Sequence, residues 1–250
     1  MSGPSSGDGP RRSQGTAKVQ TRNDVTPPDR AIFDALRMID TATLFESAAE
    51  PGFMGPDIHP IGSGLRIAGP ALTVACPGGD NLMLHAALAE ALPGEILVVQ
   101  CHDASYGVWG EVLMTSAVAR GVAGLVIDGA VRDIEALRAA RFPVFCRALS
   151  IRGATKKRRG LLRQPISCGG VLVFPGDIVV ADDSGIVVIA PAEIDEVLVR
   201  ARQRQSKEAG MMTALQEQRT TLDLLDLHAP LKKLGFDPAV GRAGDGSPKR

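Results

Sequence analysis

The stretch GVAGLVIDGAVRDIEALRAARFPVF, residues 121–145, contains an apolar run, a helical pattern and a second apolar run in close succession. The first run, residues 124–128, ends in Asp128 and a glycine. Residues 132–140 have apolar positions at helical spacing, and a short run interrupted by a proline follows at residues 142–146. Because a helix between two short apolar strands is typical of a parallel crossover, this stretch predicts a βαβ unit.

The neighbouring residues extend the alternation in both directions. Helical patterns at residues 82–92 and 111–120 enclose a buried strand at 95–100, which predicts a largely parallel sheet with helical connections. Residues 171–190 contain short β-branched runs joined by turns and predict an antiparallel meander. The other predicted elements are a helix at 31–39, strands within 65–75 broken at Gly69-Pro70, and a long helix from Pro191 to about 218.

Composition narrows the class of protein. The chain has 250 residues, 44% hydrophobic and 22% charged, which is ordinary for a soluble globular protein. Its net charge is zero and it has one Trp and one Tyr, so we expect neither an electrostatic nor a stacking surface for nucleic acid. Four cysteines without a CxxC pair indicate buried thiols in a reducing cytoplasm, and no run reaches 18 apolar residues, so no membrane span is expected.

Composition also predicts the domain organisation. Residues 1–28 are rich in Gly, Ser, Pro and Arg and predict a disordered N-terminal tail. Residues 29–228 are expected to form one α/β domain, and residues 229–250 a C-terminal tail. Phosphate-loop, GxGxxG and HExxH patterns are absent from the sequence, and no GxSxG nucleophile elbow follows a predicted strand, so the common nucleotide, hydrolase and zinc motifs do not explain it.

Two predicted helix starts follow consecutive strands and are the candidate site. Arg132 and Asp133 are expected to open one helix after a glycine turn, and the segment Gly110–Leu113 opens the preceding helix. Ligands bind at the carboxyl ends of strands in open α/β sheets, where helix amides can hold an anion. Arg132 can grip an oxyanion, and Asp133 is a hard oxygen ligand for Mg²⁺ or Mn²⁺. The alternative is structural, because the helix dipole alone favours an Asp in the first turn.

The sequence resembles a known family in several motifs. GEVL (110–113) with ARGVAGLVIDGAVRD (119–133) resembles the 4-hydroxy-4-methyl-2-oxoglutarate aldolases. That family includes 4-carboxy-4-hydroxy-2-oxoadipate aldolases and RraA-like proteins that regulate ribonuclease E. The likeness covers about residues 30–228. Further similar segments are PGGDNLMLHAAL (77–88), RFPVFCRALS (141–150), PISCGGVLVFPGDIVVADDSGIVVI (165–189) and TTLDLLDL (220–227).

The resemblance implies a fold, an assembly and an activity. The implied fold is a three-layer β/β/α swivelling-type (RraA-like) domain with a long C-terminal helix, assembled as homotrimers or homohexamers with sites near subunit contacts. The implied activity is a divalent-metal pyruvate aldolase that cleaves a 4-hydroxy-2-oxo di- or tricarboxylate to pyruvate and an oxo acid. Oxaloacetate decarboxylation is its side activity. The alternative is a non-enzymatic RraA-like regulator of ribonuclease activity that acts by protein binding.

The resemblance also implies residue roles. The amides of Gly110, Glu111, Val112 and Leu113 would bind the carboxylate and keto oxygen of pyruvate. Arg132 would contact the oxygen that becomes an enolate, and Asp133 would hold Mg²⁺ or Mn²⁺ largely through water. Glu111 would support the metal waters, as would Glu208 from a neighbouring subunit, although MMTALQEQ (211–218) departs from the family pattern there.

Several basic residues have open roles. KKRRG (156–160) is either a solvated loop or a contact for a tricarboxylate substrate. Arg147 and Arg152 are either surface residues or partners of distal substrate carboxylates.

Overall fold

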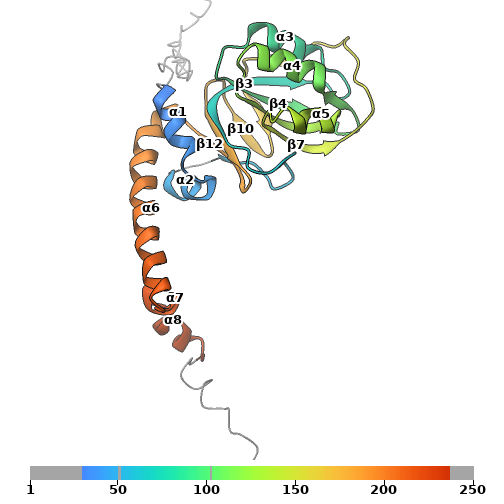
Figure 1. The fold of residues 1–250 in the computed structure, drawn as a ribbon. Coiled ribbons are helices and arrows are strands. Elements are labelled where there is room, and N and C mark those ends of the chain that lie inside the picture. The colour runs from blue at the N-terminus through green and yellow to red at the C-terminus, as the bar shows by residue number, and fades with distance from the viewer. Residues whose placement is uncertain (1–29, 50–51, 102, 237–250) are drawn as a thin grey trace, which may run out of the picture.

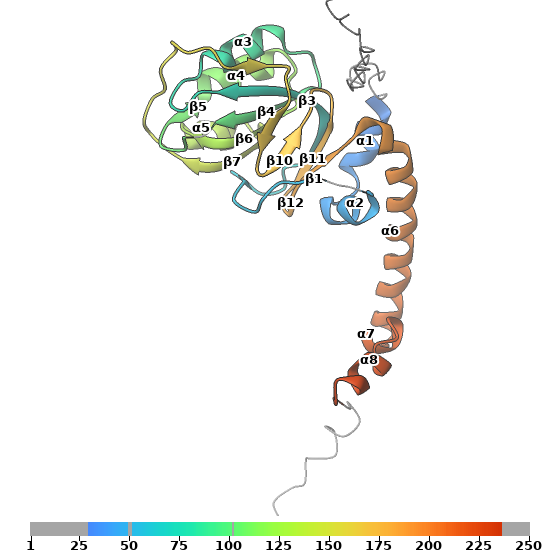
Figure 2. The same ribbon diagram turned by 180° about the vertical axis from the view of Figure 1, so that it is seen from behind.

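The structure is a computed structural model that describes residues 30–49, 52–101 and 103–236. The predicted N-terminal tail, residues 1–28, lies outside the described residues. The predicted C-terminal tail begins inside a short helix, α8 (His228–Lys233), and residues 237–250 also lie outside the description. Figures 1 and 2 show an α/β body from which one long helix extends.

Four parallel strands form the centre of the body in the order β3-β4-β6-β7. Helices α3, α4 and α5 connect them and lie together against one face (Figure 1), so the predicted βαβ series is confirmed. Apolar side chains from this face and from the helices form one buried cluster that includes Leu72, Leu84, Met114, Leu125 and Leu137. The elements are β3 (Ile67–Cys76), α3 (Leu82–Glu90), β4 (Ile96–Cys101), α4 (Glu111–Ala119), β6 (Gly124–Val131), α5 (Ile134–Ala139) and β7 (Val144–Leu149).

Strand β3 is continuous, so the break predicted at Gly69-Pro70 is wrong. Residues 67–70 pair antiparallel with β11 (Ile178–Asp182), and from Ala71 onward the strand pairs in parallel with β4. The strand therefore changes partner at the proline, which has no N–H to donate. Gly69 is needed there because a Cβ atom would lie 2.4 Å from the carbonyl oxygen of Gly94.

The antiparallel segment forms a second layer. Strand β11 pairs with β12 (Gly185–Ile189), which confirms the second half of the predicted meander. The first half is wrong, because β10 (Val171–Val173) pairs with β9 (Ile166–Cys168) in a separate two-stranded sheet. Residues from both sheets pack on the other face of the parallel strands, as the buried cluster around Phe145, Val126 and Val179 shows. The smaller strands are β1 (Gly52–Phe53), β2 (His59–Pro60), β5 (Gly107–Trp109) and β8 (Leu161–Leu162).

Further helices cover the outer side of the antiparallel strands. Helices α1 (Arg30–Arg37) and α2 (Thr41–Ser47) pack with the first turns of α6 (Ile194–Gln216) against β11 and β12. Helices α3–α5, the parallel strands and the antiparallel strands form the three predicted layers, and α6 is the predicted long C-terminal helix. No residue between 202 and 236 is buried, although this segment includes α7 (Thr221–Leu224) and α8. Neither α6 nor any other helix in the described ranges combines the length and apolarity needed to cross a bilayer.

Candidate active site

The candidate site lies at the carboxyl end of β6. This strand ends at Val131, beyond its predicted end at Asp128. Residues 130–131 pair with β7 on one side and with β5 on the other, after a register shift that follows Ile127. The turn predicted at Asp128-Gly129 is therefore wrong, because this pairing carries the strand to Val131. Helix α5 begins at Ile134, so Arg132 and Asp133 lie between strand and helix rather than in the first helical turn.

Asp133 has a left-handed backbone, with φ 57° and ψ 42°, at the N-cap position of α5. Its side chain does not cap its own helix. Instead, Oδ2 accepts a hydrogen bond of 3.1 Å from the backbone N–H of Glu111, the first residue of α4. Asp is one of the few residues that tolerates this conformation, and such backbone strain is common where a side chain must be aimed at a site.

Arg132 lies beside the same carboxylate. Its Nε is 3.6 Å from Oδ2 of Asp133, and its backbone N–H donates to the carbonyl oxygen of Trp109 over 2.8 Å. The two side chains are 43% and 42% exposed, so their attraction adds little to stability. Their charged groups therefore remain accessible to a ligand.

Gly110 allows the start of α4 to approach this pair. A Cβ atom at residue 110 would lie 2.3 Å from Oδ2 of Asp133 and 3.0 Å from Cγ of Arg132. Its φ of −159° is open to any residue, so the requirement is for space and not for backbone freedom. The predicted residues on the two elements are thus brought together.

The remaining predicted residues of α4 contribute in different ways. The side chain of Leu113 is buried in the core, so only its amide can serve a ligand. Val112 is 76% exposed and the Glu111 side chain is also exposed. The intrahelical bonds begin with Met114 N–H donating to the Gly110 carbonyl, which leaves the earlier amides at the helix end.

The segment after β7, residues 150–153, lies beside Arg132 and is called the wall below. Arg152 is the one residue of the wall that was a candidate from the sequence. Gly107 N–H donates to the Arg152 carbonyl over 2.8 Å, and a Cβ at Gly153 would lie 3.3 Å from Nη1 of Arg132. Arg152, a candidate from the sequence, holds its guanidinium 4.1 Å above the ring centre of Tyr106. Tyr106 is the only tyrosine in the chain and lies four residues before Gly110, which is the one signal that marks it.

A buried carboxylate fixes the loop that follows this wall. Asp80 is fully buried, and its Oδ2 accepts from the hydroxyl of Thr155 over 2.6 Å and from the amide of Lys157 over 2.7 Å. Desolvation opposes its ionisation, but these hydrogen bonds outweigh it and lower the pKa of Asp80 to about 2. Asp80 therefore anchors the base of the basic segment 156–160, whose four charged residues are exposed.

Two other sequence candidates are bound elsewhere in the chain. Arg147 pairs with Asp57 over 2.7 Å and also with Asp128, and these carboxylates raise its pKa. Glu208 pairs with Arg204 over 3.0 Å on α6. Both ribbon views place α6 away from α4 and α5, so a single chain does not bring Glu208 to Asp133.

The donor set is compatible with a hydrated magnesium-like cation. In the ranges that the structure describes, no group of three or more His, Cys, Asp or Glu side chains could hold a metal. A zinc site would need such a group. Mg²⁺ retains several waters and needs only one or two carboxylates, which Asp133 and the exposed Glu111 could supply.

Comparison with known proteins agrees with this fold and shows the family. The family model described as RraA-like, Aldolase/RraA, matches residues 31–188, and the chain belongs to this RraA-like family. A Halalkalibacterium halodurans protein named "Putative 4-hydroxy-4-methyl-2-oxoglutarate aldolase" is 35% identical over 178 residues, 71% of this chain and 82% of that protein.

Solved structures show the same fold. An uncharacterized protein from Pseudomonas syringae pv. tomato has a TM-score of 0.71 at 27% identity, over 80% of this chain and 99% of its own. Streptomyces coelicolor RraAS2, an unusual member of the RNase ES inhibitor RraA protein family, has a TM-score of 0.67 at 29% identity. That match covers 75% of this chain and 98% of RraAS2. The relatives thus include both a protein named as an aldolase and a member of an inhibitor family.

Proposed function

We propose that this protein is a divalent-metal-dependent pyruvate aldolase acting on a 4-hydroxy-2-oxo di- or tricarboxylate. The observation that carries the proposal is the close approach of the α4 N-terminus to Arg132 and Asp133, with only a glycine fitting between them. A binding scaffold does not need an exposed cation, an exposed carboxylate and the amides of a helix start at one point. The relative named as an aldolase supports the same assignment.

The proposed chemistry is a retro-aldol cleavage between C3 and C4 of the substrate. The amides at residues 110–113 bind the carboxylate and keto oxygen of the pyruvate half, and Arg132 donates to the C2 oxygen. As the C–C bond breaks, its electron pair moves toward that oxygen and the C4 hydroxyl loses its proton to water. Each well-placed donor to such a developing charge contributes roughly 3–4 kcal/mol. Protonation of the enolate then gives pyruvate, and the other half leaves as an oxo acid.

Asp133, with support from Glu111, would hold the Mg²⁺ or Mn²⁺. When bound, this cation supplies Lewis-acid stabilisation of negative charge on the substrate oxygen. A Schiff-base route is not needed, since no lysine lies between Lys18 and Lys156. The same enolate forms when oxaloacetate loses CO₂, which makes oxaloacetate decarboxylation the expected side activity.

The proposed assembly is a homotrimer or homohexamer. The segment 202–236 is helical yet buries none of its residues, and it exposes large apolar side chains that include Met212, Leu234 and Phe236. Helices in water are stabilised chiefly by packing of an apolar face, so this arm fits a surface of a second copy. In that assembly Glu208 would reach a neighbour's site.

The alternative function is binding without catalysis. The RraAS2 structure, titled as a member of an RNase inhibitor family, supports this second reading. The two functions respond differently to changes at the site. Loss of Arg132 or Asp133 would remove aldolase activity but would not change binding through subunit surfaces.

The deciding experiment measures pyruvate release from 4-carboxy-4-hydroxy-2-oxoadipate, 4-hydroxy-4-methyl-2-oxoglutarate and oxaloacetate. We expect turnover with Mg²⁺ that EDTA abolishes. Arg132→Ala should lower kcat by about 100-fold or more, because one well-placed donor is lost, and Asp133→Asn should remove the response to Mg²⁺. Arg30→Ala, at an exposed arginine on α1, is the matched control. Metal-independent turnover, no turnover on all three compounds, or wild-type rates in both site variants would overturn the proposal.

A further inference from the structure

A surface hollow lies at the other end of α5 from Asp133. It is lined by Leu137 and Arg138 of the helix, by Arg141 and Phe142 of the turn that follows, and by residues of the loop between β2 and β3. That loop contributes Ile61, Gly62, Ser63 and Leu65. The candidate active site lies before α5 and this hollow lies after it, so the two sites are separate.

The charges around the hollow are all of one sign. Arg138 and Arg141 both line it, and no carboxylate is among the lining residues. Neither arginine forms an ion pair with a carboxylate in the part of the chain that the structure describes. Two permanent cations at one concave surface attract an anion.

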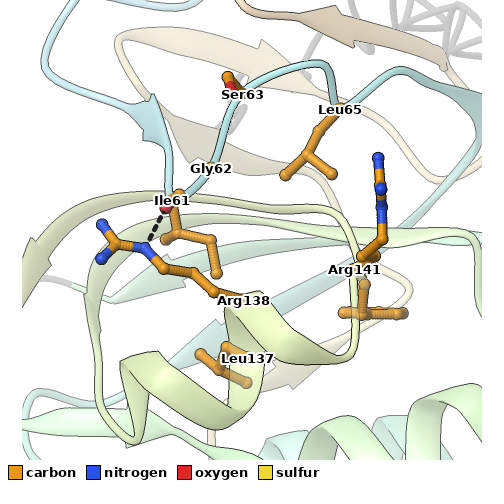
Figure 3. A pocket seen from close by; sticks show the side chains of 8 residues that line it. Ile61, Gly62, Ser63, Leu65, Leu137, Arg138 and Arg141 are labelled. Atoms are coloured by element: carbon orange, nitrogen blue, oxygen red, sulfur yellow. Dashed lines mark hydrogen bonds between the residues drawn. The ribbon is translucent and has the colours of Figure 1, made fainter.

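Arg138 is held in place by the loop. Its Nε donates a 2.6 Å hydrogen bond to the carbonyl oxygen of Ile61, which crosses from α5 to the β2–β3 loop. This bond uses one of the five guanidinium N–H groups, so the terminal nitrogens keep their donors. Figure 3 shows this bond and the orientation that it gives the side chain.

Arg141 lies at a position where the backbone conformation favours glycine. It follows the C-cap of α5 and has φ 53°, in the left-handed region. The corresponding position after α4 is Gly121, with φ 71°. Glycine is the usual residue at this point of a helix end, because a Cβ atom is disfavoured there. The chain thus places a long cationic side chain at the hollow despite a local backbone cost.

The space between the two cations is apolar. Leu137 is fully buried, and Ile61 and Phe142 are nearly so. In Figure 3 the guanidinium groups of Arg138 and Arg141 lie on opposite sides of the hollow, with the side chains of Ile61 and Leu65 between them. A ligand that matches this surface has a negative charge at each end and methylene groups in the middle.

We propose that this hollow binds a small aliphatic dicarboxylate, with one carboxylate on each guanidinium and the methylene chain over the apolar floor. Arg often binds a carboxylate through two parallel charge-assisted hydrogen bonds. The site does not depend on the aldolase reaction.

The test is calorimetric titration of succinate and glutarate into the full chain carrying Arg132→Ala, which removes the main cation of the candidate active site. We expect saturable 1:1 binding of one or both dicarboxylates, at least tenfold tighter than butyrate, which lacks the second charge. Adding Arg141→Gly should weaken binding about tenfold or more, since a charge-assisted hydrogen bond is lost. This variant should fold well because glycine favours the positive φ.

Two controls separate the site from general charge effects. Arg30→Ala removes an exposed arginine elsewhere and should leave the affinity unchanged. Amide hydrogen exchange in loop 61–65 should slow when glutarate is added to the Arg132→Ala chain, and should not slow when Arg141→Gly is also present. Absence of saturable binding by both dicarboxylates, or equal affinity with and without Arg141, would overturn the proposal.

Discussion

Replacement of Gly110 by Ala tests whether the spacing between α4 and the Arg132–Asp133 pair matters for function. The added Cβ would lie 2.3 Å from Oδ2 of Asp133, about 1 Å inside ordinary contact, so the carboxylate must move away. The hydrogen bond of 3.1 Å from Glu111 N–H is then lost or reoriented. A displacement of about 1 Å in a catalytic group can cost about 100-fold in rate.

The expected result combines a large fall in activity with a small change in stability. Asp133 is a flexible, half-exposed side chain, and an Ala in place of Gly at an N-cap costs at most about 1 kcal/mol. We therefore expect kcat for oxaloacetate decarboxylation to fall about 100-fold, while Tm changes by only a few degrees. Gly55→Ala is the control, because its Cβ would meet its nearest atom at 3.5 Å. Activity within threefold of wild type, at an unchanged fold, would refute the reasoning.

Two further predictions concern Asp80 and the helical arm. Asp80→Asn should lower the free energy of unfolding at pH 7 by about 1–3 kcal/mol, since the charged acceptor of several buried hydrogen bonds is lost. Because the folded pKa of Asp80 is lowered to about 2, its contribution is present above the unfolded pKa near 4. Denaturant unfolding should show the difference between wild type and variant shrinking from pH 4 toward pH 2, and a constant difference would contradict this. Deletion of residues 202–250 should leave the body folded but monomeric by light scattering, and a retained trimer would contradict the proposed role of the arm.

The regular part of the fold was predictable because its signal is local. Residues 82–146 alternate between helical and strand periodicity, and each predicted element is present within a few residues. The partner exchange in β3 was not predictable, since Gly69-Pro70 has the same local pattern whether a strand ends there or changes neighbour. Strand β5 was missed for a similar reason: three residues are too short to show a period, and they form a strand only by pairing with β6.

Part of the candidate site was likewise predictable from the local sequence, and part depends on contacts between residues far apart in the chain. Residues 110–113 and Arg132-Asp133 were recognisable from motifs, but the left-handed backbone of Asp133 and its hydrogen bond to α4 were not. Asp80 shows both kinds of information in one side chain. Its Oδ1 accepts from the amide of Leu82 over 3.0 Å, a local contact two residues along the chain.

The other oxygen of Asp80 binds Thr155 and Lys157, about 75 residues further along the chain. The sequence around Asp80 does not indicate these distant partners, although the hydrogen bonds to them fix the position of the wall beside Arg132. Gly107 joins the wall to Arg132, because its N–H donates to the Arg152 carbonyl and an added Cβ would lie 2.2 Å from the carbonyl oxygen of Ser150 and 2.9 Å from Cβ of Arg132. Loss of Asp80 should therefore affect the site through the position of this wall, with a change in KM that is larger than the change in kcat. A fall in kcat alone would place Asp80 in a different role from the one that its hydrogen bonds indicate.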